Sequence, residues 1–207
     1  MDIPGETGSQ ILTLFFWGKA KSGLQKVKKR YGLPEKFILY TGDITPRKNL
    51  ARLIKAFNQI EEEDLYLVMT GIKNYKTPEA NELINKSKRV KQIGYIDRDE
   101  MPYLYRLAYL YAYPSLYEGM GRPVLEAHAC GCPVVASGTS AIPEIGGDAV
   151  CYIKNPLSVE DIKNQILKVL QDEEYRQDLI AKGYENEKQF SCDISGLQIL
   201  NLMKNKS

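Results

Sequence analysis

Short apolar runs alternate with segments of helical periodicity along most of the chain, and this pattern limits the possible folds more than any other feature. The runs lie at residues 37–42, 65–71, 90–96, 110–115, 132–137 and 150–153. Because these runs are apolar along their length, we expect strands buried on both faces, as in parallel sheets covered by helices. Right-handed crossovers then give a doubly wound, mostly parallel α/β sheet of about six strands, with helices on both faces.

The regular pattern covers residues 21–190, which we interpret as one domain. The chain has 207 residues, enough for one well-filled core and short for two full domains. Residues 1–20 fit no clean period and are interpreted as a lead-in of undefined role. Residues 191–207 are expected to form a C-terminal helix.

The N-terminal segment carries no sign of a targeting signal. Its apolar run at residues 11–17 is too short to span a bilayer. The residues before that run include Asp2 and Glu6 but no basic side chain. We therefore expect a cytoplasmic protein without a transmembrane segment.

The charge balance and the scarcity of metal-binding side chains argue against two classes of function. Basic residues number 28 and acidic residues 26, so the net charge of +2 gives no reason to expect nucleic acid as a partner. No cysteines form a C-x-x-C pair, and the single histidine, His128, cannot complete a typical zinc site. We expect His128 to be structural and the cysteines to be buried, reduced thiols. The cysteines are Cys130, Cys132, Cys151 and Cys192.

Every candidate site lies at the carboxyl end of a predicted strand. Doubly wound sheets bind their ligands at the carboxyl ends of the strands. The stretches at those ends are residues 42–48, 71, 94–96, 114–121 and 137–144. This agreement predicts one crevice. The tyrosine-rich run at 103–117 lacks the interleaved basic residues of single-strand binders, so we expect it to pack in the core and the crevice.

A helix predicted over residues 122–130 begins at this edge, with Pro123 in its first turn, where a missing N–H is harmless. The backbone N–H groups of Met120, Gly121 and Arg122 precede the hydrogen bonds of that helix. Together with the helix dipole they form a ready site for an anion.

Two glutamates flank the start of this helix. Glu118 lies just before it, and Glu126 lies one turn inside, on the same face as Arg122. Like charges repel, so two carboxylates do not suit a phosphate site alone, but they can accept hydrogen bonds from sugar hydroxyls such as the vicinal diol of a ribose. A metal site is the weaker interpretation, because no third carboxylate or histidine is evident nearby. Taken singly, each glutamate is also compatible with a solvated surface position.

Two cations follow the first strand. Arg47 and Lys48 are predicted at the start of the next helix, at the same edge of the sheet. A diphosphate needs about two positive charges to balance it, and these two with a helix N-terminus could substitute for a magnesium ion. Alone they would be ordinary surface charges. Their position beside the glutamates favours a nucleotide joined to a sugar as the ligand.

Together these residues resemble the donor-binding C-terminal half of the family 4 (group 1) glycosyltransferases, which have the GT-B fold. The resemblance covers roughly residues 21–190. Residues 38–57 are similar to the family's first strand, phosphate loop and helix. Residues 90–150 are similar to its longest signature, which includes the Glu-x7-Glu motif. The resemblance implies a Rossmann-like domain, one half of a GT-B enzyme.

The resemblance also implies a role for each matching position. Arg47 and Lys48 would hold the donor's diphosphate and stabilise the leaving nucleotide, Glu126 would bind the ribose hydroxyls, and Glu118 would lie beside the transferred sugar. The family transfers a hexose from a nucleotide sugar with retention of configuration and without a bound metal, so we expect no cofactor. The remaining positions of the implied donor site are Gly42, Tyr95 and Ile96 near the base, and Gly119, Met120, Gly121, Arg122 and Pro123 at the helix start.

The chain departs from the family pattern at three points. Asp43 stands where many members have arginine, so Arg47 must supply more of the charge, and Arg122 stands where a hydrophobic residue is frequent. The third departure is that only one of the two Rossmann-like domains of a GT-B enzyme is present. We therefore expect either a cut-out domain or a chain whose acceptor-binding N-terminal half is a separate polypeptide. Any contact with a membrane surface would reside in that half.

These observations favour the donor-binding half of a retaining hexosyltransferase in glycan or glycoconjugate synthesis, nearly inactive alone, with a nucleotide-diphosphate hexose as its ligand. An alternative is a non-catalytic nucleotide-sugar-binding or regulatory module that works with a partner chain. A nicotinamide-binding domain is disfavoured, because no strand runs into a G-x-G-x-x-G motif.

Overall fold

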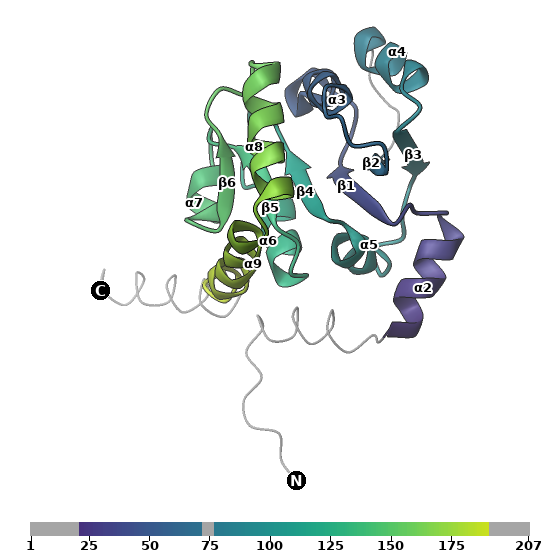
Figure 1. The fold of residues 1–207 in the computed structure, drawn as a ribbon. Helices are drawn as coiled ribbons and strands as arrows, with labels where there is room; N and C mark the ends of the chain where they lie inside the picture. Colours follow the sequence, from purple (N-terminus) through teal and green to yellow (C-terminus); the bar gives the residue numbers. More distant parts are fainter. Residues whose placement is uncertain (1–20, 72–76, 191–207) are drawn as a thin grey trace, which may run out of the picture.

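The computed structural model describes residues 21–71 and 77–190. Within them, six strands form one parallel sheet in the order β3-β2-β1-β4-β5-β6 (Figure 1). The strands are β1 (Lys36–Thr41), β2 (Leu65–Thr70), β3 (Val90–Gly94), β4 (Leu110–Tyr113), β5 (Val134–Ser137) and β6 (Val150–Ile153). The predicted doubly wound sheet is confirmed.

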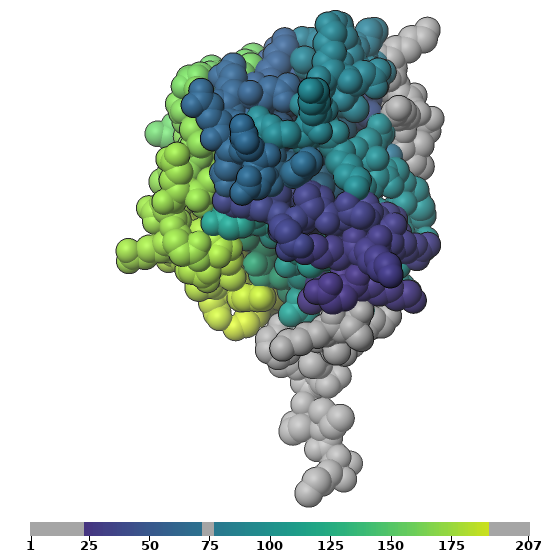
Figure 2. All heavy atoms as spheres, turned by 45° about the vertical axis from the view of Figure 1, so that its right-hand side comes forward, coloured from purple at the N-terminus to yellow at the C-terminus, as the bar shows by residue number. Residues whose placement is uncertain are grey.

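Helices cover both faces of this sheet (Figure 1). They are α2 (Lys21–Arg30), α3 (Leu50–Asn58), α4 (Pro78–Lys86), α5 (Met101–Leu107), α6 (Arg122–Ala129), α7 (Ile142–Gly146), α8 (Val159–Gln171) and α9 (Glu173–Glu187), with a short 3-10 turn, η1 (Pro46–Lys48). One face carries α3, α4 and α8, and the other carries α2, α5, α6 and α7. Figure 2 shows α2 in purple on the outside of the molecule, against teal segments, in keeping with its contacts with α5.

Successive side chains of a strand point to opposite faces of the sheet, so one apolar run can pack against the helices on both faces. Ile38 and Tyr40 of β1 pack with α3 and α8, whereas Phe37 and Leu39 pack with α5 and α6. All four side chains are fully buried. Each large apolar side chain buried in this way contributes about 1.5–3 kcal/mol to the free energy of unfolding. A polar residue at any of these positions would therefore be costly.

The edge strand β3 is the exception to this burial. All five of its residues are only half-buried, and it pairs with β2 alone. The order of the sheet reverses between β1 and β4, which are neighbours joined by long connections. Ligands of such sheets bind at this switch point, outside the carboxyl ends of the strands.

Two strand ends approach each other closely beside the switch point. Gly42 follows β1 and its N–H donates to the carbonyl of Thr70 at 3.0 Å. Gly71 follows β2, has φ 142°, and a Cβ built on it would lie 2.1 Å from the carbonyl oxygen of Gly42. Only glycine fits there. These two glycines thus let the ends of β1 and β2 lie directly against each other.

The structure corrects one expectation about the segment that follows β1. Arg47 and Lys48 do not begin a helix; they lie in η1, and α3 begins at Leu50. Asn49 separates the two elements because its backbone is left-handed, with φ 59°. The cations are therefore presented by a tight turn and not by the first turn of α3.

Several other expectations concern buried groups and the termini. Cys130, Cys132 and Cys151 are free and buried, as predicted. His128 is 1% exposed, and its Nδ1 lies 3.2 Å from Nδ2 of Asn186. Burial lowers the pKa of His128 to about 4, so it is neutral at physiological pH. The lead-in over residues 1–20, the helix expected over 191–207 and Cys192 lie outside the described residues.

Candidate functional site

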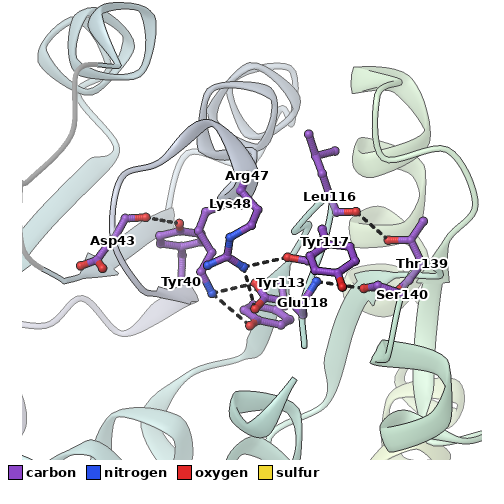
Figure 3. A network of polar contacts seen from close by, with 10 residues as sticks. All are labelled: Tyr40, Asp43, Arg47, Lys48, Tyr113, Leu116, Tyr117, Glu118, Thr139 and Ser140. Atoms are coloured by element: carbon purple, nitrogen blue, oxygen red, sulfur yellow. Dashed lines mark hydrogen bonds and ion pairs between the residues drawn. The ribbon is translucent and has the colours of Figure 1, made fainter. Parts of the chain in front are cut away.

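Three loops meet at the carboxyl end of the switch point: the loop after β1, the loop between β4 and α6, and the loop after β5 (Figure 3). The first two are joined along the backbone, because the N–H of Leu116 donates to the carbonyl of Arg47 at 2.8 Å. They are also joined through Asn49, whose side-chain amide donates to the carbonyls of Pro114 at 3.1 Å and Pro156 at 2.6 Å. The loops that carry the predicted site residues therefore form one structure.

Arg47, Lys48 and Glu118 form the centre of this site, which we call the cation–carboxylate cluster. Nη1 of Arg47 lies 2.8 Å from Oε2 of Glu118, and Nζ of Lys48 lies 2.8 Å from Oε1 (Figure 3). Each carboxylate oxygen is thus paired with its own cation. Glu118 is 9% exposed. The predicted meeting of these three residues at one edge is confirmed.

The two cations differ in their surroundings. Lys48 is nearly buried, donates to the hydroxyl of Tyr113 at 3.0 Å, and has its Nζ 4.7 Å from the centre of that ring. Arg47 is about half exposed and also donates to the carbonyl of Tyr117 at 2.7 Å. The carboxylate of Asp43 points away from the cluster in Figure 3 and does not neutralise it.

The electrostatics of the cluster keep its carboxylate ionised. Burial raises the pKa of Glu118, but hydrogen bonds from Lys48, Ser115 and Arg47 outweigh burial, and the net pKa lies below the ordinary value. Burial and the negative charge of Glu118 raise the pKa of Tyr113, so its phenol stays protonated. At neutral pH the cluster therefore holds two cations and one carboxylate.

The loop after β5 fixes the backbone at Glu118. The N–H of Glu118 donates to Oγ of Ser140 at 2.9 Å, and that hydroxyl donates to the carbonyl of Thr139 at 2.7 Å. Oγ1 of Thr139 donates to the carbonyl of Leu116 at 3.4 Å. Ser140 has φ 54°, a strained value for a residue other than glycine.

Sequence reasoning placed residues 137–144 at this edge but did not single out Ser140 or Asn49. For Asn49 a signal was available, because an asparagine between Pro-Arg-Lys and an apolar helix is a frequent choice for a left-handed position. For Ser140 the sequence holds no local signal, since its role depends on Glu118, 22 residues earlier in the chain.

The start of α6 has the predicted form. Gly121 precedes the helix with φ 75°, and Pro123 stands in the first turn. The first helical hydrogen bond in the backbone runs from Val124 to Gly121 at 2.9 Å, so the N–H groups of Met120, Gly121 and Arg122 lie ahead of it. Met120 is exposed.

Glu126 lies on α6 in a more open environment than Glu118. Its side chain is 34% exposed, and its Oε1 lies 3.3 Å from Nε of Arg122, which is 70% exposed. Its Oε2 accepts a hydrogen bond from the hydroxyl of Tyr105 at 3.2 Å. The prediction that Arg122 and Glu126 lie on one face of this helix is confirmed, and the two side chains form an ion pair.

A row of buried tyrosines connects the two glutamates. Tyr105 of α5 meets Tyr111 edge to face, with ring centres 5.3 Å apart, and Tyr111 stacks on Tyr113 at 5.6 Å. The hydroxyl of Tyr111 lies 2.9 Å from Oγ1 of Thr41, at the end of β1. All three rings are at most 2% exposed. These three tyrosines therefore pack in the core, as predicted, whereas Tyr117 at the end of the same run is 65% exposed.

The stretch after β3 divides into an exposed and a buried residue. Tyr95 is 69% exposed and Ile96 is 4% exposed.

Among the described residues, no group of three or more histidine, cysteine, aspartate or glutamate side chains is arranged to hold a metal ion. None of the described helices is long and apolar enough to cross a bilayer.

Fold and site together define a Rossmann-like α/β domain with a cluster of charged side chains at its switch point. The family described as "Glycosyl transferases group 1" matches residues 24–186. The chain belongs to this family. It corresponds to the C-terminal half of a GT-B fold, because it matches the solved C-terminal domain of a group 1 glycosyltransferase from Francisella tularensis. That match has 26% identity and a TM-score of 0.72, and it covers 89% of this chain and 97% of the other.

Curated relatives include mannosyltransferases. The O-antigen chain mannosyltransferase B of Escherichia coli is 35% identical over 174 residues, which cover 81% of this chain and 45% of the relative. A GDP-mannose-dependent mannosyltransferase of Corynebacterium glutamicum, which acts on a phosphatidylinositol monomannoside, is 27% identical over 173 residues, covering 79% and 45%. The chain spans about half the length of these relatives.

Proposed function

We propose that this chain is the donor-binding half of a retaining hexosyltransferase that takes part in glycan synthesis, with a nucleotide-diphosphate hexose as its donor. The observation that carries the proposal is the convergence of Arg47, Lys48 and Glu118 at the switch point of a group 1 glycosyltransferase domain. The acceptor would be bound by the other half of the enzyme.

The diphosphate is assigned to Arg47 and Lys48. When the bond between the anomeric carbon and the terminal phosphate oxygen breaks, negative charge develops on the leaving diphosphate. The two cations and the N–H groups ahead of α6 would stabilise that charge. Lys48 is held by Tyr113 and Glu118, so it is already in place before the donor arrives.

The ribose is assigned to Glu126 and the hexose to the neighbourhood of Glu118. A partly exposed carboxylate can accept from both hydroxyls of a vicinal diol, and Oε2 of Glu126 is already oriented by Tyr105. Glu118 lies beside the cations that would hold the terminal phosphate, which is the phosphate that carries the sugar. The exposed ring of Tyr95 is assigned to the surroundings of the base.

The relatives favour mannose as the hexose and guanine as the base. Their names include an O-antigen chain mannosyltransferase, a serotype-specific mannosyltransferase and a GDP-mannose-dependent mannosyltransferase. Saturation-transfer NMR of the full chain with GDP-mannose, UDP-glucose, ADP-glucose and NAD tests this assignment. We expect signal transfer to GDP-mannose that is lost in Lys48→Ala. Transfer to NAD alone, or to none of the four ligands, would contradict the proposed function.

A further inference from the structure

Glu118 occupies the position of an anion in the site. One oxygen lies on Arg47 and the other on Lys48, each at 2.8 Å, which is the arrangement that two oxygens of a phosphate would adopt. We propose that Glu118 is a specificity-determining residue: a built-in counterion that makes the site prefer the nucleotide-sugar donor over the free nucleoside diphosphate. The inference rests on the proposed function and adds to it a means of releasing the product.

The geometry keeps Glu118 close to an arriving phosphate. The N–H of Glu118 donates to Oγ of Ser140. Two residues earlier, the N–H of Leu116 donates to the backbone carbonyl of Arg47. The carboxylate is 9% exposed and stays ionised, since its cation partners lower its pKa. A phosphate that binds the two cations must therefore share them with this negative charge.

Donor and product differ in charge at this point. In the donor, an oxygen of the terminal phosphate is esterified to the hexose, so that phosphate carries a single negative charge, and the hexose hydroxyls can donate to Glu118. In the free diphosphate the terminal phosphate has a second ionisable oxygen with a pKa of about 6, close to that of a phosphorylated side chain, and above this pH it carries nearly two charges. The same carboxylate therefore attracts the donor and repels the product.

The different exposures of Arg47 and Lys48 are compatible with two cations that are shared between Glu118 and a bound phosphate. Arg47 is about half exposed and rests on a backbone carbonyl, so its guanidinium can follow a phosphate outward. Lys48 is nearly buried and held by Tyr113, so it would stay with Glu118. When the sugar has been transferred, the repulsion from Glu118 acts on the new charge of the diphosphate and favours its departure.

The test is calorimetric titration of the full chain with GDP and GDP-mannose at pH 8, with UDP and UDP-glucose as a second pair. The measured quantity is the ratio of the two dissociation constants. We expect Glu118→Gln to shift this ratio about tenfold in favour of the free diphosphate. The shift should shrink at pH 5.5, where the terminal phosphate holds a proton. Glu79→Gln, which removes an exposed partner of Lys55, is the matched control and should leave the ratio unchanged.

A second variant separates charge from structure. Glu118→Asp keeps the charge and should keep most of the discrimination, even if its unfolding temperature falls. An unchanged ratio in Glu118→Gln, or an equal loss in both Glu118 variants, would overturn the inference while leaving the proposed function intact. Absence of binding by either ligand pair to the unmodified chain would instead overturn the proposed function.

Discussion

The two glutamates of the site, eight residues apart, occupy contrasting environments. Glu118 is nearly buried, with each oxygen on its own cation, whereas Glu126 is 34% exposed and pairs with a largely exposed Arg122. Breaking a buried ion pair is costly because a charge is left without a partner, whereas an exposed pair contributes little. Glu118 is therefore coupled to the fold, and we propose that it also acts on the phosphate, whereas the partial exposure of Glu126 is in keeping with its proposed role at the ribose.

Lys48→Ala tests the buried surroundings of Glu118, and we expect it to have the largest effect on nucleotide affinity. It removes a nearly buried cation from Glu118 and from the predicted diphosphate site. We expect the affinity for a nucleoside diphosphate to fall by about 3 kcal/mol, the upper range for a hydrogen bond to a charged group, with little change for the nucleoside. Calorimetry with GDP and guanosine measures both. Lys55→Ala, which breaks an exposed pair with Glu79, is the control; equal losses for the two ligands would remove Lys48 from the phosphate site.

Glu126→Ala tests the role of the partly exposed glutamate. We expect the affinity for a nucleoside diphosphate to fall by about 1–3 kcal/mol, because the ribose hydroxyls lose a charged acceptor. The free energy of unfolding should change by less than about 1 kcal/mol, since the carboxylate is partly exposed. Glu82→Ala, which removes another exposed i,i+4 partner on a helix, is the control. An unchanged affinity would argue against the ribose role.

Tyr105→Phe tests whether Glu126 depends on its hydrogen bond from the buried Tyr105. The change removes the hydroxyl that donates to Oε2 of Glu126 and keeps the ring against Tyr111. We expect a loss of about 1 kcal/mol in nucleotide affinity, and no further loss when Glu126 is already alanine. Tyr109→Phe, whose hydroxyl makes only a 3.4 Å contact with Glu173, is the control. Additive losses in the double variant would show that Tyr105 acts independently of Glu126.

Arg122→Ala should have the smallest effect. Its side chain is 70% exposed, and its pair with Glu126 resembles other surface pairs of neighbouring helical turns. We expect changes below about 0.5 kcal/mol in the free energy of unfolding, measured by urea denaturation. A loss of about 3 kcal/mol or more, as expected for breaking a buried ion pair, would erase the contrast between the two glutamates' surroundings.

The sequence predicts much of the fold and part of the site, for identifiable reasons. Apolar strands that end in glycine predict a parallel sheet, and its carboxyl edge brings Arg47, Lys48 and Glu118 together without knowledge of any contact. Each oxygen of Glu118 pairs with one cation because side chains pack between two loops that lie 70 residues apart in the sequence. No local sequence pattern predicts such a contact. The helix was predicted to include Arg47 and Lys48 because helical periodicity is insensitive to one left-handed residue, and Asn49 supplies that residue.

The most direct test of the account is calorimetric titration of GDP and its 2′,3′-dideoxy analogue against the unmodified chain, Lys48→Ala and Glu126→Ala. We assign the diphosphate to the cation–carboxylate cluster and the ribose to Glu126. We therefore expect Lys48→Ala to weaken the binding of both ligands, and Glu126→Ala to weaken the binding of GDP while leaving that of the dideoxy analogue unchanged. If Glu126→Ala weakened both ligands equally, or if Lys48→Ala weakened neither, the division of roles between the two glutamates' surroundings would be wrong.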